Sequence, residues 1–108
     1  MILTAWMSRE TPDSAISRMQ KKLASVPEKP GVYLFQDGSH KVLYVGKAKT
    51  LRDRLRSYFR KSSGLDPRKS AMVASACDFE FTVTGNELEA LVLEANLIKQ
   101  HRPRYNVL

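Results

Sequence analysis

The sequence predicts a small α/β domain in which three strands form a largely antiparallel sheet flanked by helices. Two runs rich in β-branched and aromatic residues, 32–35 and 42–45, lie on either side of a polar segment that contains Gly38, as in a β-hairpin. A third run, 79–83, alternates apolar and polar residues, which is typical of a half-buried strand. Apolar residues at helical spacing occur before, between and after these runs, so we expect helices to pack against the sheet.

Composition limits the class of protein. The 108 residues suit one domain that buries its own core. Eighteen Lys and Arg against eleven Asp and Glu give a net charge of +7, which favours a nucleic-acid partner, although an ordinary basic surface explains the composition equally well. Cys77 is the single cysteine, which excludes an intrachain disulfide and fits a reducing, cytoplasmic compartment. No apolar run reaches the ~18 residues that cross a membrane.

The first part of the chain divides into a leader and a helix. Residues 1–12 show no periodicity and are expected to form a flexible leader, so the folded domain should span 13–108. The first helix should begin with Asp13 or Ser14 as its N-cap and turn Met19 towards the core. It should end near residue 25, because prolines follow at once.

The hairpin carries the first indication of a site. Gly31 lies two residues before Tyr33, and Gly46 lies two residues after Tyr44. Glycine weakens a strand and usually marks a close approach of another group to the backbone. The hairpin should therefore bring two phenols and two positions without side chains together.

Three further helical segments are expected around the third strand. One begins after Thr50 and turns a single apolar stripe to the core, namely Leu51, Leu55, Tyr58 and Phe59. A Ser-, Gly- and Pro-rich loop, 61–67, leads to a modest helix over 67–76. The last helix starts with Asn86 as N-cap, and the chain after Pro103 should be extended. Because apolar residues cover most of its circumference, this last helix should be packed on several sides.

Glu94 interrupts the apolar sequence of the last helix. A buried, unpaired carboxylate is costly, so it needs a cation, a hydrogen-bond network or a raised pKa. One interpretation is a solvent-facing seam or a lysine partner, and the other is a metal ligand, since a carboxylate with water molecules often holds Mg²⁺ near phosphates. His101 follows two turns later, and its role stays open.

A dense group of cations lies between the second strand and the end of the following helix: Lys47, Lys49, Arg52, Arg54, Arg56 and Arg60. A solvated helix face and a surface that contacts phosphates both explain it. Arg52 and Arg56 should face solvent, whereas Arg54 lies at the margin of the buried stripe. Nucleotide-binding loops, catalytic triads, zinc clusters and paired carboxylates are absent from the sequence. The remaining polar residues fit phosphodiester cleavage by one metal ion, one general base and cationic stabilisation of the phosphate.

The segments Gly31-Val32-Tyr33 and Tyr44-Val45-Gly46 resemble the signature of the GIY-YIG endonucleases, with valine in place of isoleucine in both. The stretches 44–59, 89–99 and 102–107 are similar to the N-terminal nuclease domain of UvrC, a bacterial excision-repair family. The likeness runs from about residue 23 to residue 108, is loose over 65–76, and does not cover 1–12.

The resemblance implies a divalent-metal-dependent DNA endonuclease domain that makes the 3′-side incision of damaged double-stranded DNA in nucleotide excision repair. It would be a monomeric fragment of a larger protein within the UvrABC excinuclease, whose UvrB-contacting regions and 5′ nuclease lie elsewhere. The isolated domain should therefore cut DNA poorly. A catalytically silent DNA-binding module and a homing or restriction nuclease are the alternatives.

The resemblance also implies a site composed of Tyr33, Tyr44, Lys47, Arg54, Tyr58, Glu94 and Asn106. Glu94 would be the one protein ligand of a Mg²⁺ or Mn²⁺ ion. Tyr44 would be the general base, helped by Lys47 or by a metal-bound hydroxide, because a phenol with a pKa near ~10 needs a cation to act at neutral pH. Arg54 would stabilise charge on the scissile phosphate and Tyr58 would position it. Tyr33 and Asn106 would order the network and hold phosphate or water, and the DNA backbone would be contacted by Lys49, Arg52, Arg56 and Arg60.

Overall fold

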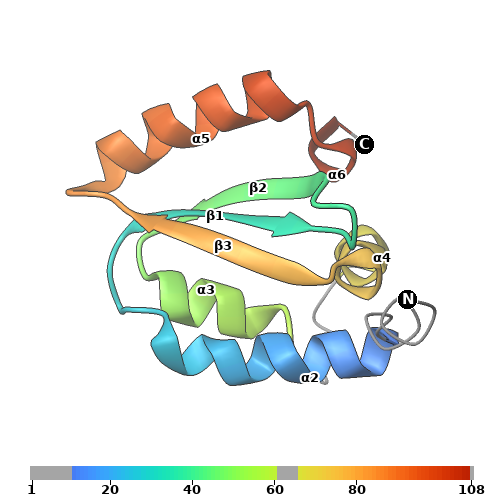
Figure 1. Ribbon diagram of the computed structural model, residues 1–108. Helices are drawn as coiled ribbons and strands as arrows, with labels where there is room; N and C mark the ends of the chain where they lie inside the picture. The colour runs from blue at the N-terminus through green and yellow to red at the C-terminus, as the bar shows by residue number, and fades with distance from the viewer. Residues whose placement is uncertain (1–10, 61–65, 108) are drawn as a thin grey trace, which may run out of the picture.

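A three-stranded antiparallel sheet forms the centre of the computed structural model, which describes residues 11–60 and 66–107. The strands are β1 (Gly31–Gln36), β2 (Val42–Ala48) and β3 (Asp78–Val83), in the order β2-β1-β3. Helix α5 (Glu87–His101) covers one face of the sheet (Figure 1). The opposite face and the end of the sheet are covered by α2 (Pro12–Lys22), a 3₁₀ turn (Leu23–Ser25), α3 (Leu51–Ser57) and α4 (Pro67–Ser75). The predicted fold class is confirmed.

The predicted hairpin is present, and both of its strands are longer than the apolar runs that indicated them. Tyr33 of β1 pairs with Gly46 of β2, and Val32 pairs with Lys47. The turn is closed by Asp37, whose carboxylate accepts the backbone N–H groups of Ser39 at 2.8 Å and Lys41 at 3.0 Å. The register of β1 and β2 decides which side chains share a face of the sheet.

The sheet face towards α2, α3 and α4 carries the main hydrophobic core. Its fully buried side chains come from all of these elements and include Met19, Phe35, Leu51, Leu55, Met72 and Phe79. The apolar stripe predicted for α3 is confirmed, with Tyr58 3% exposed. The predicted N-cap, Asp13 or Ser14, is wrong: α2 begins at Pro12, and Thr11 caps it by accepting the backbone N–H of Ser14 at 3.1 Å. Residues 1–10 and 61–65 lie outside the described residues.

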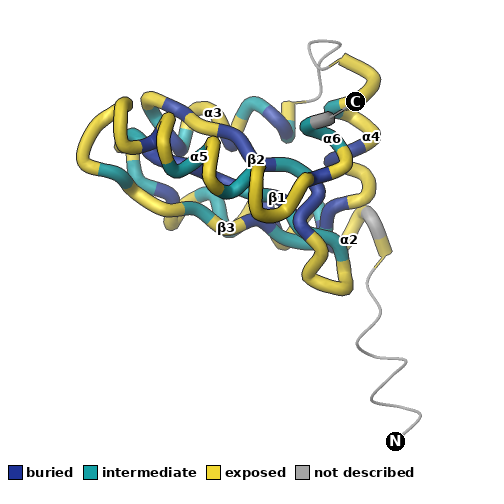
Figure 2. The backbone as a smooth tube through the Cα atoms, turned by 90° about the horizontal axis from the view of Figure 1, so that it is seen from above, coloured by how far each residue is buried: buried dark blue, intermediate teal, exposed yellow. Residues whose placement is uncertain are grey.

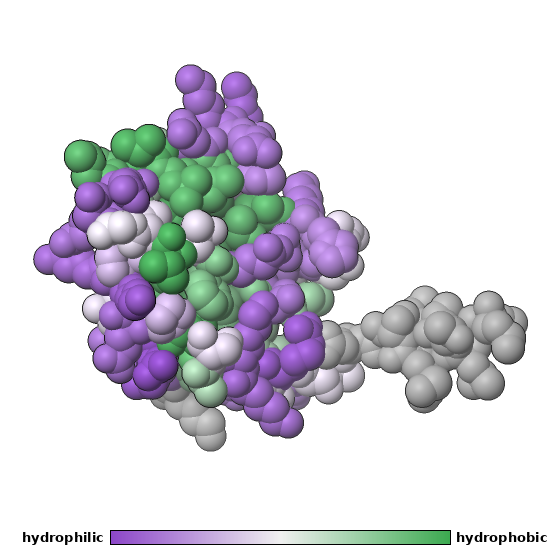
Figure 3. Space-filling model, turned by 60° about the vertical axis from the view of Figure 1, so that its left-hand side comes forward, coloured by the Kyte–Doolittle hydropathy of each residue, from purple (hydrophilic) through white to green (hydrophobic). Residues whose placement is uncertain are grey.

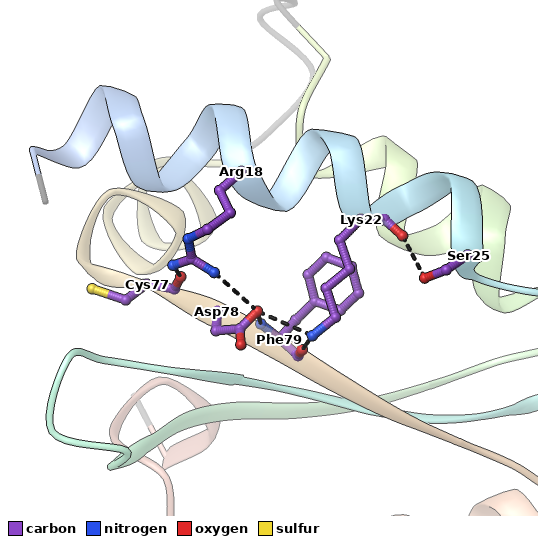
Figure 4. A network of polar contacts seen from close by, with 6 residues as sticks. All are labelled: Arg18, Lys22, Ser25, Cys77, Asp78 and Phe79. Atoms are coloured by element: carbon purple, nitrogen blue, oxygen red, sulfur yellow. Dashed lines mark hydrogen bonds and ion pairs between the residues drawn. The ribbon is translucent and has the colours of Figure 1, made fainter.

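Polar contacts attach α2 to the start of β3 (Figure 4). The carboxylate of Asp78 lies 3.6 Å from the Arg18 guanidinium and 3.1 Å from the Lys22 ammonium. Lys22 also donates to the Phe79 carbonyl at 2.5 Å, and Arg18 donates to the Cys77 carbonyl. These contacts fix α2 across the sheet, which helps to close the core beneath it.

Helix α5 begins as predicted but is packed differently. Asn86 caps it by accepting the N–H of Glu89 at 2.8 Å. Ala90 is its one buried residue, while the exposed fractions of Leu88, Leu91 and Val92 are 67%, 48% and 54%. The prediction of packing on several sides is therefore wrong: in the described part of the chain, α5 packs on β1 and β2. Most of its residues are exposed (Figure 2), and apolar side chains remain at the surface (Figure 3). No helix in the described parts of the chain is long and apolar enough to cross a membrane.

The end of the chain is helical and not extended as predicted. Arg102 takes a left-handed conformation with φ 44° and ends α5. Pro103 then precedes α6 (Arg104–Val107), whose turn is closed by the N–H of Asn106 donating to the Pro103 carbonyl at 3.1 Å. A proline is well suited to the start of a helix because its φ is fixed near helical values. Helix α6 lies beside β2 (Figure 1).

Candidate active site

The structure brings the three predicted tyrosines together. The Tyr33 and Tyr58 hydroxyls, from β1 and the end of α3, lie 2.6 Å apart in a hydrogen bond. The Tyr44 ring of β2 completes the cluster, with its centroid 6.3 Å from that of Tyr33 and 6.4 Å from that of Tyr58. Tyr33 and Tyr58 are buried and Tyr44 is half-buried. Tyr44 is therefore the member of the cluster that is open to a substrate.

Both hairpin glycines are positions of close approach, as predicted. A Cβ on Gly46 would lie 2.4 Å from the Cζ and hydroxyl oxygen of Tyr33, so the missing side chain leaves room for that ring. A Cβ on Gly31 would lie 2.2 Å from the Thr82 carbonyl oxygen and 2.7 Å from Leu51 Cδ1. Gly46 thus serves the tyrosine cluster directly, whereas Gly31 lets β3 and α3 pack against the hairpin.

Burial determines the protonation of two of the tyrosines. It raises the pKa of Tyr33 well above its ordinary value near ~10, against a hydrogen bond from Tyr58 that lowers it. Burial also raises the pKa of Tyr58, and the neighbouring phenols add to the effect. Both groups are protonated at neutral pH and act as hydroxyls. The charges of Arg54 and Glu94 act on Tyr33 with opposite signs, which places both residues in the electrostatic neighbourhood of the cluster.

Glu94 lies on the face of α5 that is turned towards the sheet, four residues after the buried Ala90. It is half-buried, which corrects the expectation of a buried carboxylate. Among the described residues no lysine or arginine forms an ion pair with it, so the lysine-partner interpretation does not hold there.

A divalent cation at Glu94 would meet a single protein carboxylate. Within the described ranges there is no group of three or more His, Cys, Asp or Glu residues that could hold a metal. A cation at Glu94 would therefore take this one carboxylate and complete its shell with water or phosphate oxygens, as Mg²⁺ commonly does. The two buried hydroxyls nearby are neutral and supply no competing charge.

Lys47 and Arg54 line one groove. It has a volume of about 720 Å³, lies between α3 and the beginning of α5, and also contains Lys49 and Leu91. Lys47 pairs with Val32 and Tyr44 pairs with Phe35, and alternation along β2 puts these two pairs on opposite faces of the sheet. The three-residue spacing between Tyr44 and Lys47 therefore does not bring their side chains together along the strand.

Asn106 of α6 forms two hydrogen bonds to the backbone of β2. Its Oδ1 accepts the N–H of Val45 at 2.8 Å, and its Nδ2 donates to the Val45 carbonyl at 2.9 Å. The amide thus bonds the backbone next to Tyr44, which accords with the role in ordering the network that the resemblance implied. The asparagine orders the site by holding the strand that carries Tyr44.

A second, smaller concavity of about 240 Å³ lies beside Tyr44. Besides Tyr44 and Asn106, it is lined by Asp66, Arg68, Lys69, Met72 and Tyr105. Sequence reasoning did not assign the cations of α4 to the site. Their signal is Arg-Lys in the first turn of a helix, but no local pattern indicates that this turn meets Tyr44.

The predicted DNA-contacting residues do not form one uniform surface. Lys49, Arg56 and Arg60 are exposed. Arg52 is turned inwards, which corrects the prediction that it faces solvent: its Nε donates to the Val26 carbonyl at 2.7 Å. Its Nη1 also lies 3.3 Å from a carboxylate oxygen of Glu28, so this arginine ties α3 to the segment before β1. His101 is exposed at the end of α5.

Comparison with known proteins gives matches over the part of the chain that contains this site. A model of the family described as the UvrC-like GIY-YIG domain matches residues 29–107. UvrABC system protein C from Synechococcus sp. (strain JA-2-3B'a(2-13)) is 57% identical over 90 residues, which are 83% of this chain and 14% of that protein. The corresponding protein from Moorella thermoacetica is 56% identical over 89 residues, with 82% and 14% covered. The chain thus spans about one seventh of the length of these curated relatives.

Solved structures agree with the sequence matches. The GIY-YIG N-terminal endonuclease domain of UvrC from Thermotoga maritima, bound to its catalytic magnesium, is 42% identical and superposes with a TM-score of 0.73. The match covers 82% of this chain and 94% of that domain. A variant of the same domain with a tyrosine replaced by phenylalanine, also bound to the catalytic cation, gives a TM-score of 0.75. The resemblance inferred from the two glycine–tyrosine motifs is confirmed.

Proposed function

Because the chain belongs to the UvrC-like GIY-YIG domain family, we propose that it is a divalent-metal-dependent endonuclease domain that hydrolyses a phosphodiester bond of DNA. One observation carries the proposal: the half-buried Tyr44 ring lies against the hydrogen-bonded Tyr33–Tyr58 pair. The charges of Arg54 and Glu94 both act on Tyr33. A carboxylate for a metal, a cation for phosphate and a phenol open to substrate are the parts that metal-assisted hydrolysis needs.

Glu94 would hold one Mg²⁺ or Mn²⁺ ion, which when bound neutralises charge on the phosphate and polarises its oxygens. Arg54 and Lys47 approach the phosphate from the groove between α3 and α5, where their fixed charges stabilise the additional negative charge of the transition state. Because α3 is anchored in the core by Leu51 and Leu55, the backbone that carries Arg54 is held in place before substrate binds.

Tyr44 would accept the proton of the attacking water. Tyr58 and Tyr33 are buried and protonated, so they serve as hydrogen-bond donors that orient the Tyr44 hydroxyl and its substrate and do not compete as bases. Asn106 holds the backbone of the adjacent Val45 in place. A role as general base predicts that Tyr44→Phe lowers the cleavage rate by ~10²–10⁴.

Within a longer protein, the proposed reaction is the incision on the 3′ side of a lesion in nucleotide excision repair. The support is the similarity to UvrABC system protein C in several bacteria, of which this chain matches 14% of the length. The full protein would work with UvrB through regions outside this domain, on damaged double-stranded DNA. The assignment to repair favours a lesion-directed nuclease over a homing or restriction enzyme.

The experiment uses a chimera in which this chain replaces the N-terminal domain of a full-length UvrC relative. The chimera is made with the unmodified chain and with the Glu94→Gln variant. Incision of a duplex with one defined lesion is measured with UvrA, UvrB and Mg²⁺. We expect the unmodified chimera to cut on the 3′ side and Glu94→Gln to abolish that cut, because the glutamine amide is a neutral and much weaker ligand for a hard cation. Tyr44→Phe tests the base in the same assay.

Two controls make the result decisive. A substrate already nicked on its 3′ side tests the other incision, which Glu94→Gln should leave intact if the chimera assembles. Circular dichroism of the isolated 108-residue variant reports whether it is folded. Undiminished 3′ incision by a folded Glu94→Gln chimera would remove Glu94 from the metal site and overturn the mechanism.

A further inference from the structure

The concavity beside Tyr44 contains two cations that the proposed mechanism does not use. Arg68 and Lys69 lie in the first turn of α4 and line this space together with Tyr105 and Asn106. It is separate from the groove that holds Lys47 and Arg54, with which it shares no lining residue. Tyr44, the half-buried phenol of the cluster, borders the smaller space.

Lys69 is directed towards the site. Its Nζ lies 5.8 Å from the centroid of the Tyr58 ring, and the residue is half-buried although it lies on a short surface helix. Lysine side chains that have no local role normally extend into solvent with the ammonium fully hydrated. Here the ammonium instead lies over the buried tyrosine pair, next to the concavity.

The one carboxylate of this concavity already has a structural role. Asp66 caps α4, and its Oδ1 accepts the backbone N–H of Lys69 at 2.9 Å. The lining therefore combines two cationic side chains with one capping carboxylate, and the hydroxyl of Tyr105 adds a neutral donor. This composition suits an anion that is bound by side chains.

The strand β2 connects the two spaces. Lys47 lines the larger groove and Tyr44 the smaller concavity, and three residues of a strand extend about 10 Å. A few nucleotides of one DNA strand cover this span, since each strand carries a phosphate per 3.4 Å or so of helix rise. A DNA strand that spans the two spaces can thus present one phosphate to each.

We propose that Lys69, with Arg68 and Tyr105, forms a second phosphate subsite that holds a backbone phosphate of the strand being cut, next to the scissile phosphate at Glu94 and Arg54. The inference rests on the proposed function, because it names how the same site binds its DNA. Its effect is to fix the register of the strand against Tyr44, so that the phenol faces one defined phosphate.

The test measures binding without cleavage. The 108-residue chain is titrated into a fluorescent 20-base-pair duplex in the presence of EDTA, at several salt concentrations. The slope of log affinity against log salt is then determined for Lys69→Gln, for Lys69→Arg and for Lys21→Gln, an exposed lysine of α2 that serves as matched control. Each lost phosphate contact should lower the magnitude of the slope by about 0.9.

We expect Lys69→Gln to lower the slope by about that amount and Lys69→Arg and Lys21→Gln to keep it. A slope for Lys69→Gln equal to that of Lys21→Gln would overturn the subsite. If Lys69→Gln and Lys69→Arg reduced the slope equally, the role of Lys69 would be to pack against the Tyr58 ring. That result would also contradict the proposal. Since the assay contains no metal, its outcome is independent of the Glu94 test of the proposed function.

Discussion

The two faces of the sheet differ in how completely the helices that cover them are buried. The face towards α2, α3 and α4 is closed by large side chains with almost no exposure, among them Phe35, Leu55 and Phe79. Among the described residues, the other face is covered by α5, which buries Ala90 and leaves Leu88 67% exposed. Tyr33 and Tyr58 belong to the first face, and Glu94 is supplied by the second. The tyrosine network is thus fixed by the main core, whereas the proposed metal ligand lies on a helix that leaves several apolar side chains exposed.

The largest expected contrast compares one leucine from each side. Leu55→Ala empties a fully buried position of α3 and should lower the free energy of unfolding by about 2–5 kcal/mol. Leu88→Ala removes a mostly exposed side chain of α5 and should change it by about 0.5 kcal/mol or less. Urea unfolding followed by circular dichroism measures both. Equal losses would mean that α5 is as essential to the core as α3.

The next contrast uses two glycines. Gly46→Ala introduces a Cβ 2.4 Å from the Tyr33 ring, so it should displace that ring and lower the free energy of unfolding by about 1–3 kcal/mol. Gly38→Ala is the matched control, because its Cβ meets only Cys77 Sγ at an ordinary 3.6 Å. Thermal unfolding of the two variants gives the comparison. An unaffected Gly46→Ala protein would show that Tyr33 is not confined by β2.

The buried tyrosines should make the protein sensitive to alkali. Both have pKa values raised above the ordinary ~10, so the unfolded chain loses these protons at lower pH than the folded chain does. Their contribution is fully present below about pH 10, and above it stability should fall by up to ~1.4 kcal/mol per pH unit for each tyrosine. Urea midpoints between pH 8 and pH 11 measure this. Tyr58→Phe should flatten the dependence, and an unchanged curve for that variant would count against its burial.

The smallest expected effect comes from the edge of β2. Asn106→Ala removes two hydrogen bonds to Val45 at a partly solvated edge, where water can replace them, so the loss should be about 1 kcal/mol. Amide hydrogen exchange of Val45 should nevertheless accelerate strongly, because its N–H loses its partner. Exchange at the wild-type rate would show that α6 protects this strand without the asparagine.

Sequence reasoning succeeded where a local pattern determines the structure. The β1–β2 hairpin and the Leu51, Leu55 and Tyr58 stripe follow from periodicity and turn residues, and the glycine–tyrosine motifs indicated that Tyr33 and Tyr44 lie close together. Tyr58 joined that site through the family resemblance. These features need no knowledge of which elements become neighbours in space.

Features that depend on tertiary neighbours were missed. The apolar circumference of α5 indicated burial, but only one sheet face is available to it. Arg52 has the spacing of a solvent-facing residue, yet Val26 and Glu28 lie within its reach. The approach of Lys69 to Tyr58 joins residues of α4 and the end of α3, and no periodicity encodes such a contact.

The central claim is that Glu94, from the helix on one face of the sheet, completes a metal site beside the tyrosines of the other face. The most direct test is the anomalous difference density of crystals of this chain soaked in Mn²⁺, with Glu94→Gln crystals as control. We predict one peak at the Glu94 carboxylate, between α5 and the edge of β2, that is absent from the variant. A peak bound by other side chains, or one that persists in Glu94→Gln, would contradict the account.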